Sequence, residues 1–143
     1  MESQLAAYWR NVRLEPYGEV ERREFAFQLP SGSFVRHRKF STEEEVRGEA
    51  AKLKAVAAFH SIAVYESPEV EDMEGKRMLG ADLFFDLDIK GSNVRESLGR
   101  ALEIGAVLVD ILVEELVVSK SKIRVAYSGH RGLSPIRSTP TYS

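Results

Sequence analysis

Cysteine is absent from this sequence of 143 residues. Its absence excludes disulfide bonds, thiolate zinc sites and a cysteine nucleophile, and it suits a reducing compartment. No apolar run approaches the length that crosses a membrane, and the first residues lack the basic and apolar regions of a signal peptide. We therefore expect a cytoplasmic protein.

A strong charge of one sign is also absent, because 20 lysines and arginines stand against 22 aspartates and glutamates. The formal net charge of −2 gives no overall attraction to nucleic acid. With 43% hydrophobic and 29% charged residues, the composition predicts one domain with a hydrophobic core. Any local basic surface starts in the first forty residues, which contain Arg10, Arg13, Arg22, Arg23, Arg36, Arg38 and Lys39.

The most informative segment is the alternating pattern of residues 80–89, which predicts a β-strand with two different faces. One face is apolar and consists of Ala81, Leu83, Phe85, Leu87 and Ile89. The other face presents the carboxylates of Asp86 and Asp88, roughly 7 Å apart along the backbone. A divalent cation such as Mg²⁺ or Mn²⁺ would relieve their repulsion. The alternative, which is more frequent for an isolated Asp-x-Asp pair, is the solvated face of an edge strand.

A second informative segment follows about forty residues later, where an apolar run from Val125 stops at a glycine-flanked turn. The turn carries a hydroxyl, an imidazole and a guanidinium, on Ser128, His130 and Arg131. Backbone N–H groups and an arginine fork in such a turn can bind phosphate oxygens.

The remaining patterns predict a chain that mixes helices and strands. Thr42 and Glu45 form a capping box for a helix that ends near Phe59, with an apolar face of Val46, Ala50, Leu53 and Ala57. Ser92 and Asn93 can cap a long helix with an apolar stripe from Val94 to Leu116. We further expect a helix at 5–9, a hairpin of strands 24–29 and 33–40, a strand at 61–65, an acidic loop at 66–74 and a strand at 122–127.

Five blocks in this order resemble the catalytic small subunit of archaeal and eukaryotic DNA primases. The blocks are residues 23–27, 36–40, 63–65, 80–88 and 128–132. The resemblance covers the chain from about Tyr8 to Gly132, and the archaeal members look closest because the long helix follows the aspartate strand almost directly. It implies an α+β, primase-type fold with a mixed or antiparallel sheet flanked by helices, in which residues 1–132 are the N-terminal part of the catalytic domain.

The resemblance also implies an activity, which is nucleotidyl transfer from nucleoside triphosphates to make primers on single-stranded DNA during replication. The expected partner is the large primase subunit, in a heterodimer that forms part of the primosome. Asp86 and Asp88 match the catalytic aspartates that hold Mg²⁺ or Mn²⁺ in the family.

Nucleotide-binding positions of the family match Ser128, His130, Arg131 and Arg36, and Glu24 is a further candidate near the same site. The alternatives are a hairpin surface carboxylate for Glu24 and a solvated strand arginine for Arg36. His37 stays unassigned, because a lone histidine in a strand is more often a packed or surface residue than a ligand.

The sequence departs from the family pattern near its end. Ser134 stands where the family has a phosphate-binding histidine, Pro135 would remove a donor from the expected strand, and a third metal-binding aspartate is not present. We therefore expect residues 133–143 to be an irregular tail, and the C-terminal part of the catalytic domain to be missing through truncation or a frameshift. The alternatives to an active primase are a non-catalytic nucleotide- or nucleic-acid-binding fragment and an inert remnant.

Overall fold

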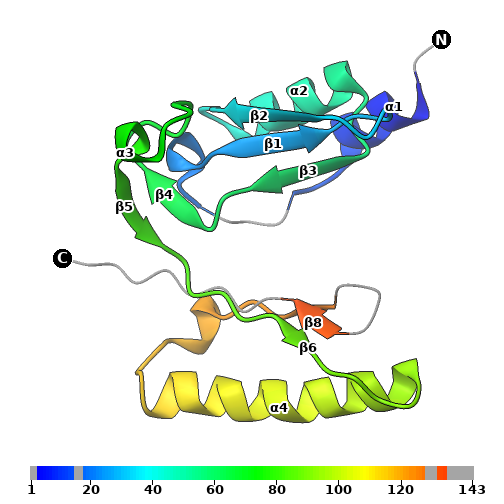
Figure 1. Cartoon of the computed structure of the whole chain (residues 1–143), viewed down its shortest axis with the longest axis vertical. Helices are drawn as coiled ribbons and strands as arrows, with labels where there is room; N and C mark the ends of the chain where they lie inside the picture. The colour runs from blue at the N-terminus through cyan, green and yellow to red at the C-terminus, as the bar shows by residue number, and fades with distance from the viewer. Residues whose placement is uncertain (1–2, 15–17, 128–131, 135–143) are drawn as a thin grey trace. The chain divides into compact units, whose positions relative to one another are not determined.

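The computed structural model describes residues 3–14, 18–127 and 132–134 of the chain (Figure 1). These residues form two compact units, residues 1–81 and residues 82–143. Helices are combined with antiparallel strand pairs, which confirms the predicted α+β class. In the described residues, no helix is long and apolar enough to cross a membrane.

The first unit contains a three-stranded antiparallel sheet of order β2-β1-β3 and a separate antiparallel pair of β4 and β5 (Figure 1). Its elements are α1 (Gln4–Asn11), η1 (Val20–Arg22), β1 (Phe25–Gln28), β2 (Phe34–Arg38), α2 (Glu43–Leu53), β3 (Ala57–His60), β4 (Ala63–Tyr65), α3 (Met73–Lys76) and β5 (Met78–Ala81).

The hairpin of β1 and β2 confirms the prediction from the strand patterns. Gly32 adopts a φ of 88°, a left-handed conformation that costs glycine little, and its N–H donates to the Leu29 carbonyl. The Leu29 N–H donates to the Ser33 carbonyl, which closes the turn. The register that results places Phe27 opposite Val35 and Gln28 opposite Phe34.

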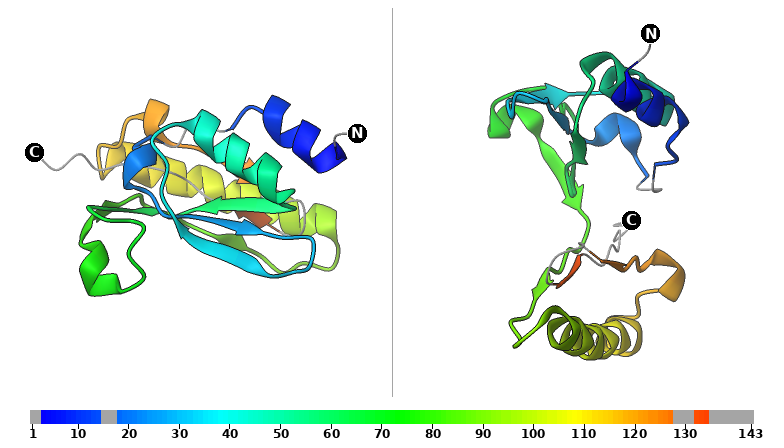
Figure 2. Two further views of the ribbon diagram at one scale, coloured as in Figure 1. Left: turned by 90° about the horizontal axis from the view of Figure 1, so that it is seen from above. Right: turned by 90° about the vertical axis from the view of Figure 1, so that its right-hand side faces the viewer.

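One side of this sheet is covered by α1 and α2 (Figure 2). Phe25 and Phe27 alternate with half-buried neighbours along β1 and enter the core between sheet and helices. The core also contains Ala6, Trp9, Val46, Ala50, Ala51 and Ala55. The Trp9 Nε1–H donates to the Ala55 carbonyl at 2.7 Å, which satisfies the polar atom of this buried ring.

Helix α2 begins as predicted but ends earlier. The Glu45 N–H donates to Thr42 Oγ1 at 3.2 Å, and the Ser41 N–H donates to the Glu45 carboxylate at 2.7 Å. The helix stops at Leu53, where Lys54 turns left-handed with a φ of 51°. The prediction that it continues to Phe59 was wrong, because Ala57 pairs with Gln28 in the sheet and belongs to β3.

The second unit contains a short sheet of order β6-β8-β7 with one long helix packed against β6 and β8 (Figure 1). Its elements are β6 (Leu87–Asp88), α4 (Val94–Glu114), η2 (Lys120–Lys122), β7 (Ala126–Tyr127) and β8 (Gly132–Ser134). Both outer strands run antiparallel to β8, so β6 and β7 run in the same direction without being neighbours. The strand predicted at 122–127 is therefore confirmed only in its last two residues.

Strand β8 extends into the segment that the sequence predicts to be irregular. Leu133 pairs with Leu87 and with Tyr127, and Ser134 pairs with Ala126. For these two residues the expectation of an irregular tail was wrong. The remainder of that tail, residues 135–143, lies outside the described residues.

Two features determine where helix α4 starts: the cap at Asn93 and the close approach of Gly91 to Ser97. Asn93 Oδ1 accepts from the Glu96 N–H at 2.8 Å, which confirms the predicted cap. A Cβ atom at Gly91 would lie 2.8 Å from Ser97 Oγ and 2.9 Å from the Ser97 nitrogen. The buried side of the helix consists of Ser97, Ala101, Gly105 and Leu112, whereas Val94, Leu102 and Leu116 of the predicted stripe are exposed.

We expect Gly91→Ala to lower the free energy of unfolding by about 1–3 kcal/mol, because the backbone of Ser97 would have to move. The matched control is Gly99→Ala within α4, where a Cβ meets nothing within 4 Å. That change should raise stability by up to about 1 kcal/mol through helix propensity. Urea unfolding of both variants measures the difference, and equal stability of the two would contradict the close approach.

Candidate functional site

The predicted strand of residues 80–89 is two short strands that belong to different units. Strand β5 ends at Ala81 and pairs with β4, and β6 covers only Leu87 and Asp88. The predicted alternation fails at the start of the segment, where Asp82 is buried and Leu83 and Phe84 are exposed. The prediction of one continuous strand was therefore wrong, because the chain leaves one sheet before it enters the next.

The alternation holds from Phe85 onwards, where it matters for the carboxylates. Asp86 and Asp88 are exposed, whereas Phe85, Leu87 and Ile89 between and beside them are half-buried. Asp86 lies directly before β6 and Asp88 lies within it, so the alternation places both aspartates on one side of this segment, roughly 7 Å apart along the backbone. The helix α4 packs against β6.

Strand β8 connects the aspartates to the second segment singled out in the sequence. Gly132 pairs with Asp88, so the two residues lie opposite each other in the antiparallel ladder. Opposed residues of such a ladder have Cα atoms about 4.5–5.5 Å apart. The predicted nucleotide-binding residues Ser128, His130 and Arg131 lie outside the described residues, but the chain continues from them directly into Gly132.

Within the described part of the chain, no group of three or more His, Cys, Asp or Glu side chains is arranged to hold a metal ion. Asp86 and Asp88, the metal ligands expected from the sequence, therefore belong to no such group. Their carboxylate oxygens are hard donors of the kind that fits Mg²⁺ or Mn²⁺.

Glu24 and Arg36, the other two predicted site residues, belong to the first unit and differ in their surroundings. Arg36 is exposed on β2, as in the alternative of a solvated strand arginine. Glu24 directly precedes β1, and only 19% of its side chain is exposed. Glu24 is therefore not the solvated surface carboxylate of the alternative interpretation.

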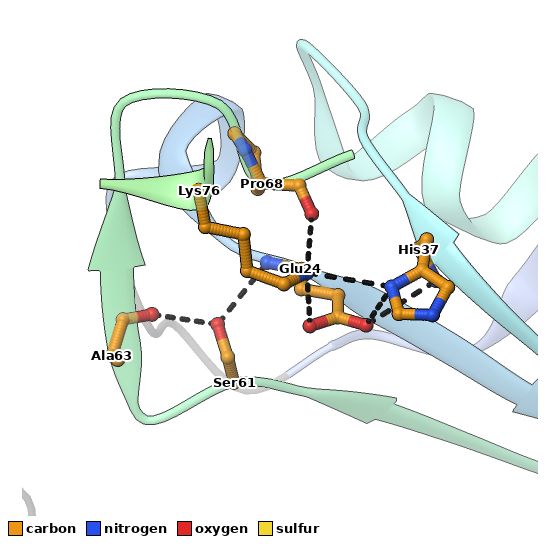
Figure 3. A network of polar contacts seen from close by, with 6 residues as sticks. All are labelled: Glu24, His37, Ser61, Ala63, Pro68 and Lys76. Atoms are coloured by element: carbon orange, nitrogen blue, oxygen red, sulfur yellow. Dashed lines mark hydrogen bonds and ion pairs between the residues drawn. The ribbon is translucent and has the colours of Figure 1, made fainter. Parts of the chain in front are cut away.

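The Glu24 carboxylate belongs to a polar network that the sequence did not reveal (Figure 3). The Lys76 ammonium is 1% exposed and donates to Glu24 Oε2 at 2.8 Å and to the Pro68 carbonyl at 3.0 Å. It also lies 5.4 Å from the centre of the Tyr65 ring. A buried ammonium needs such partners, because leaving it unpaired costs several kcal/mol.

His37 joins this network through an irregularity of the sheet. Its φ of 56° is left-handed, and the register between β1 and β2 shifts next to it. The His37 Nδ1 atom lies 3.0 Å from Glu24 Oε1 and 3.4 Å from Lys76 Nζ, and the His37 N–H donates to Glu24 Oε1. The network thus joins β2 to the start of β1 and to α3.

A second buried cation, Arg23, anchors the same end of β1. Its side chain is fully buried and donates to the carbonyls of Gly18, Ser61 and Ile62. The Ser61 hydroxyl accepts from the Glu24 N–H and donates to the Ala63 carbonyl. Arg23 and Ser61 therefore join β1 to the connection between β3 and β4.

The pKa of Glu24 reflects competing effects of this environment. Burial is the largest effect and raises the pKa, but the hydrogen bond and the charge of Lys76, followed by His37, lower it further than burial raises it. The net result is a pKa below the ordinary value of 4.5. Because the folded state lowers this pKa, ionised Glu24 stabilises the fold above the ordinary pKa, and the stabilisation is lost as pH falls through the lowered value.

We expect Glu24→Gln to lower the free energy of unfolding at neutral pH by about 1.5–3 kcal/mol, because the buried Lys76 loses its anionic partner. Urea unfolding measures this loss, and the difference from wild type should shrink at pH values well below 4.5. Glu66→Gln is the matched control, since its ion pair with Arg77 is largely exposed and should contribute about 0–1 kcal/mol. A difference that persisted unchanged at low pH would contradict the ionic role of Glu24.

Comparison with known proteins supplies relatives from several archaea, although no protein-family model matches the chain. The DNA primase small subunit PriS of Pyrobaculum arsenaticum is 41% identical over 135 residues, which cover 87% of this chain and 43% of that protein. PriS of Hyperthermus butylicus is 34% identical over 147 residues, covering 87% of this chain and 39% of that protein. PriS of Methanosarcina acetivorans is 28% identical over 141 residues, covering 92% of this chain and 34% of that protein.

These relatives, together with the α+β fold, define the chain as a homologue of DNA primase subunits. The chain belongs to the family of DNA primase small subunits and spans less than half the length of the curated relatives it matches. The resemblance noted in the sequence is thereby confirmed.

Proposed function

We propose that the protein is the catalytic small subunit of a DNA primase, which makes short primers on single-stranded DNA from nucleoside triphosphates during replication. The observation that carries the proposal is the pairing of Asp88 with Gly132 beside the exposed carboxylate of Asp86. It supports one site built from the two aspartates and the segment that ends at Arg131. The proposed partner is the large primase subunit, and the proposed place of action is the cytoplasm.

The proposed reaction is an attack of the primer 3′-hydroxyl oxygen on the α-phosphorus of a nucleoside triphosphate. The hydroxyl loses its proton to solvent, a new phosphodiester bond forms, the bond between the α-phosphorus and the bridging oxygen breaks, and pyrophosphate leaves. When bound by Asp86 and Asp88, Mg²⁺ or Mn²⁺ would lower the pKa of the attacking hydroxyl and neutralise charge on the phosphates.

The chain's own residues have distinct roles in this proposal. Asp86 and Asp88 present hard oxygen donors from one side of β6, and the pairing with β8 holds that strand in place. Ser128, His130 and Arg131 bind the triphosphate, since a guanidinium and a glycine-flanked backbone suit phosphate oxygens. The family resemblance is the support for placing Arg36 in the nucleotide site. Glu24 contacts His37 and thereby positions β2, the strand that carries Arg36.

Mn²⁺ binding tests the assignment of the two aspartates without requiring catalysis by the chain. We expect wild type to bind Mn²⁺ in a titration followed by electron paramagnetic resonance, and the variant with Asp86→Asn and Asp88→Asn to lose this binding. The matched control is Asp110→Asn, which removes an exposed carboxylate from α4 and should leave binding unchanged. If the double variant bound Mn²⁺ as wild type does, the pair would be an ordinary solvated face.

A further inference from the structure

The three-stranded sheet of the first unit carries two exposed aromatic rings on the side that its helices do not cover. Phe34 on β2 is 53% exposed and Phe59 on β3 is 47% exposed. Phe34 pairs with Gln28 and Phe59 pairs with Ala26, the two residues that alternate with the core residues of β1. Both rings therefore lie on the face opposite the core.

The two rings lie close enough together to form one aromatic surface. Their centres are 6.0 Å apart and their planes are tilted by 46°. They come from the two outer strands of the sheet, with β1 between them. Adjacent large apolar side chains on an open sheet face mark interaction sites, so the pair indicates a binding surface.

The strand that carries Phe34 also carries positive charge. Arg36 is exposed on β2 two residues after Phe34 and forms no ion pair with another described residue. Arg38 pairs with the core residue Phe25 beyond the register shift, so it lies on the other face of the sheet. Lys39 follows β2, and its Nζ atom forms only a long ion pair of 3.9 Å with Glu69 Oε2. The nearby carboxylate of Glu24 is already paired with Lys76 and does not offset these charges.

We infer that Phe34 and Phe59 form a stacking surface for the bases of single-stranded nucleic acid, with Arg36 and Lys39 attracting its phosphates. Exposed aromatic rings beside arginines on a sheet suit unpaired strands, whose base faces are accessible, whereas a duplex hides them. The inference rests on the proposed function, in which an unpaired template strand is used, and it names the residues that would hold that strand.

The test is the affinity of the full chain for a fluorescently labelled oligothymidylate, measured by fluorescence anisotropy. Phe34→Ala and Phe59→Ala should each weaken binding about five- to a hundredfold, because stacking on one ring contributes about 1–3 kcal/mol. The slope of log affinity against log salt should stay as in wild type, since no charge is removed. Tyr8→Ala is the matched control, because Tyr8 is a 56% exposed aromatic residue on α1, which packs on the other face, and it should bind as wild type.

A substituted tryptophan gives a second readout that reports stacking itself. Trp9 is the only tryptophan of the chain and is 7% exposed, so its fluorescence should change little on binding. Phe59→Trp should retain affinity and show strong quenching by the oligonucleotide. Absence of quenching would overturn the stacking surface, as would unchanged affinity in both alanine variants or absence of binding by wild type.

Failure of this inference can be distinguished from failure of the proposed function. Mn²⁺ titration of wild type tests the site of Asp86 and Asp88, whereas oligonucleotide binding by wild type and by the alanine variants of Phe34 and Phe59 tests the stacking surface. If the alanine variants of Phe34 and Phe59 instead changed only the oligomeric state, the rings would cover another protein surface and the inference would be wrong. Mn²⁺ binding by wild type would still support the site of Asp86 and Asp88.

Discussion

The candidate site depends on the backbone pairing of two very short strands, β6 and β8. Asp88 would not lie opposite Gly132 without this ladder, and an isolated pair of two- and three-residue strands is unstable in water. The long helix α4 packs against both strands and stabilises them. Its buried residues Ala101 and Gly105 are small, which permits a close approach of helix and sheet. The cap at Asn93 and the contact of Gly91 with Ser97 then determine where this helix begins after the aspartates.

The first unit has a hydrophobic core between its sheet and helices, and two buried cations add further order at one end of β1. Arg23 and Lys76 are both buried, and each is satisfied by carbonyl or carboxylate oxygens from segments far apart in the sequence. Removing one partner of such a buried group costs more than the contact contributes, which makes these contacts specific as well as stabilising. They hold the start of β1, the central strand of the sheet, next to the strand that carries Arg36.

Local signals in the sequence were sufficient for much of the fold. Side chains that bind the backbone a few residues away predict the helix starts at Thr42 and Asn93, and the glycine turn at Gly32 predicts the hairpin. The end of α2 could not be predicted in this way, because the pairing of Ala57 with Gln28 is a tertiary contact that overrides helical spacing. The break between β5 and β6 has the same origin. The apolar and polar residues alternate in the sequence across the break, but β5 pairs with β4 and β6 pairs with β8, in two different sheets.

For the site, the sequence predicted the shared face of Asp86 and Asp88 but not the surroundings of Glu24. Period-two alternation is a local property, so the exposure of the two aspartates follows from their half-buried neighbours. The network of Glu24, His37 and Lys76 joins residues that are far apart in the chain, and a left-handed histidine has no sequence signature. Only the completed fold shows that Lys76, at the end of α3, is the buried partner of that carboxylate.

The central claim is that Asp86, Asp88 and the segment of the chain that leads into Gly132 form one site for a metal-bound nucleoside triphosphate. Nuclear magnetic resonance of the isotope-labelled chain titrated with Mn²⁺ and ATP tests it most directly, because the paramagnetic ion broadens signals of nearby nuclei. The account predicts that the amide signals of Leu87, Asp88 and Gly132 broaden first, and that they do not broaden in the variant with Asp86→Asn and Asp88→Asn. Broadening centred instead on the acidic segment of residues 66–74, with sharp signals at Asp88 and Gly132, would contradict it.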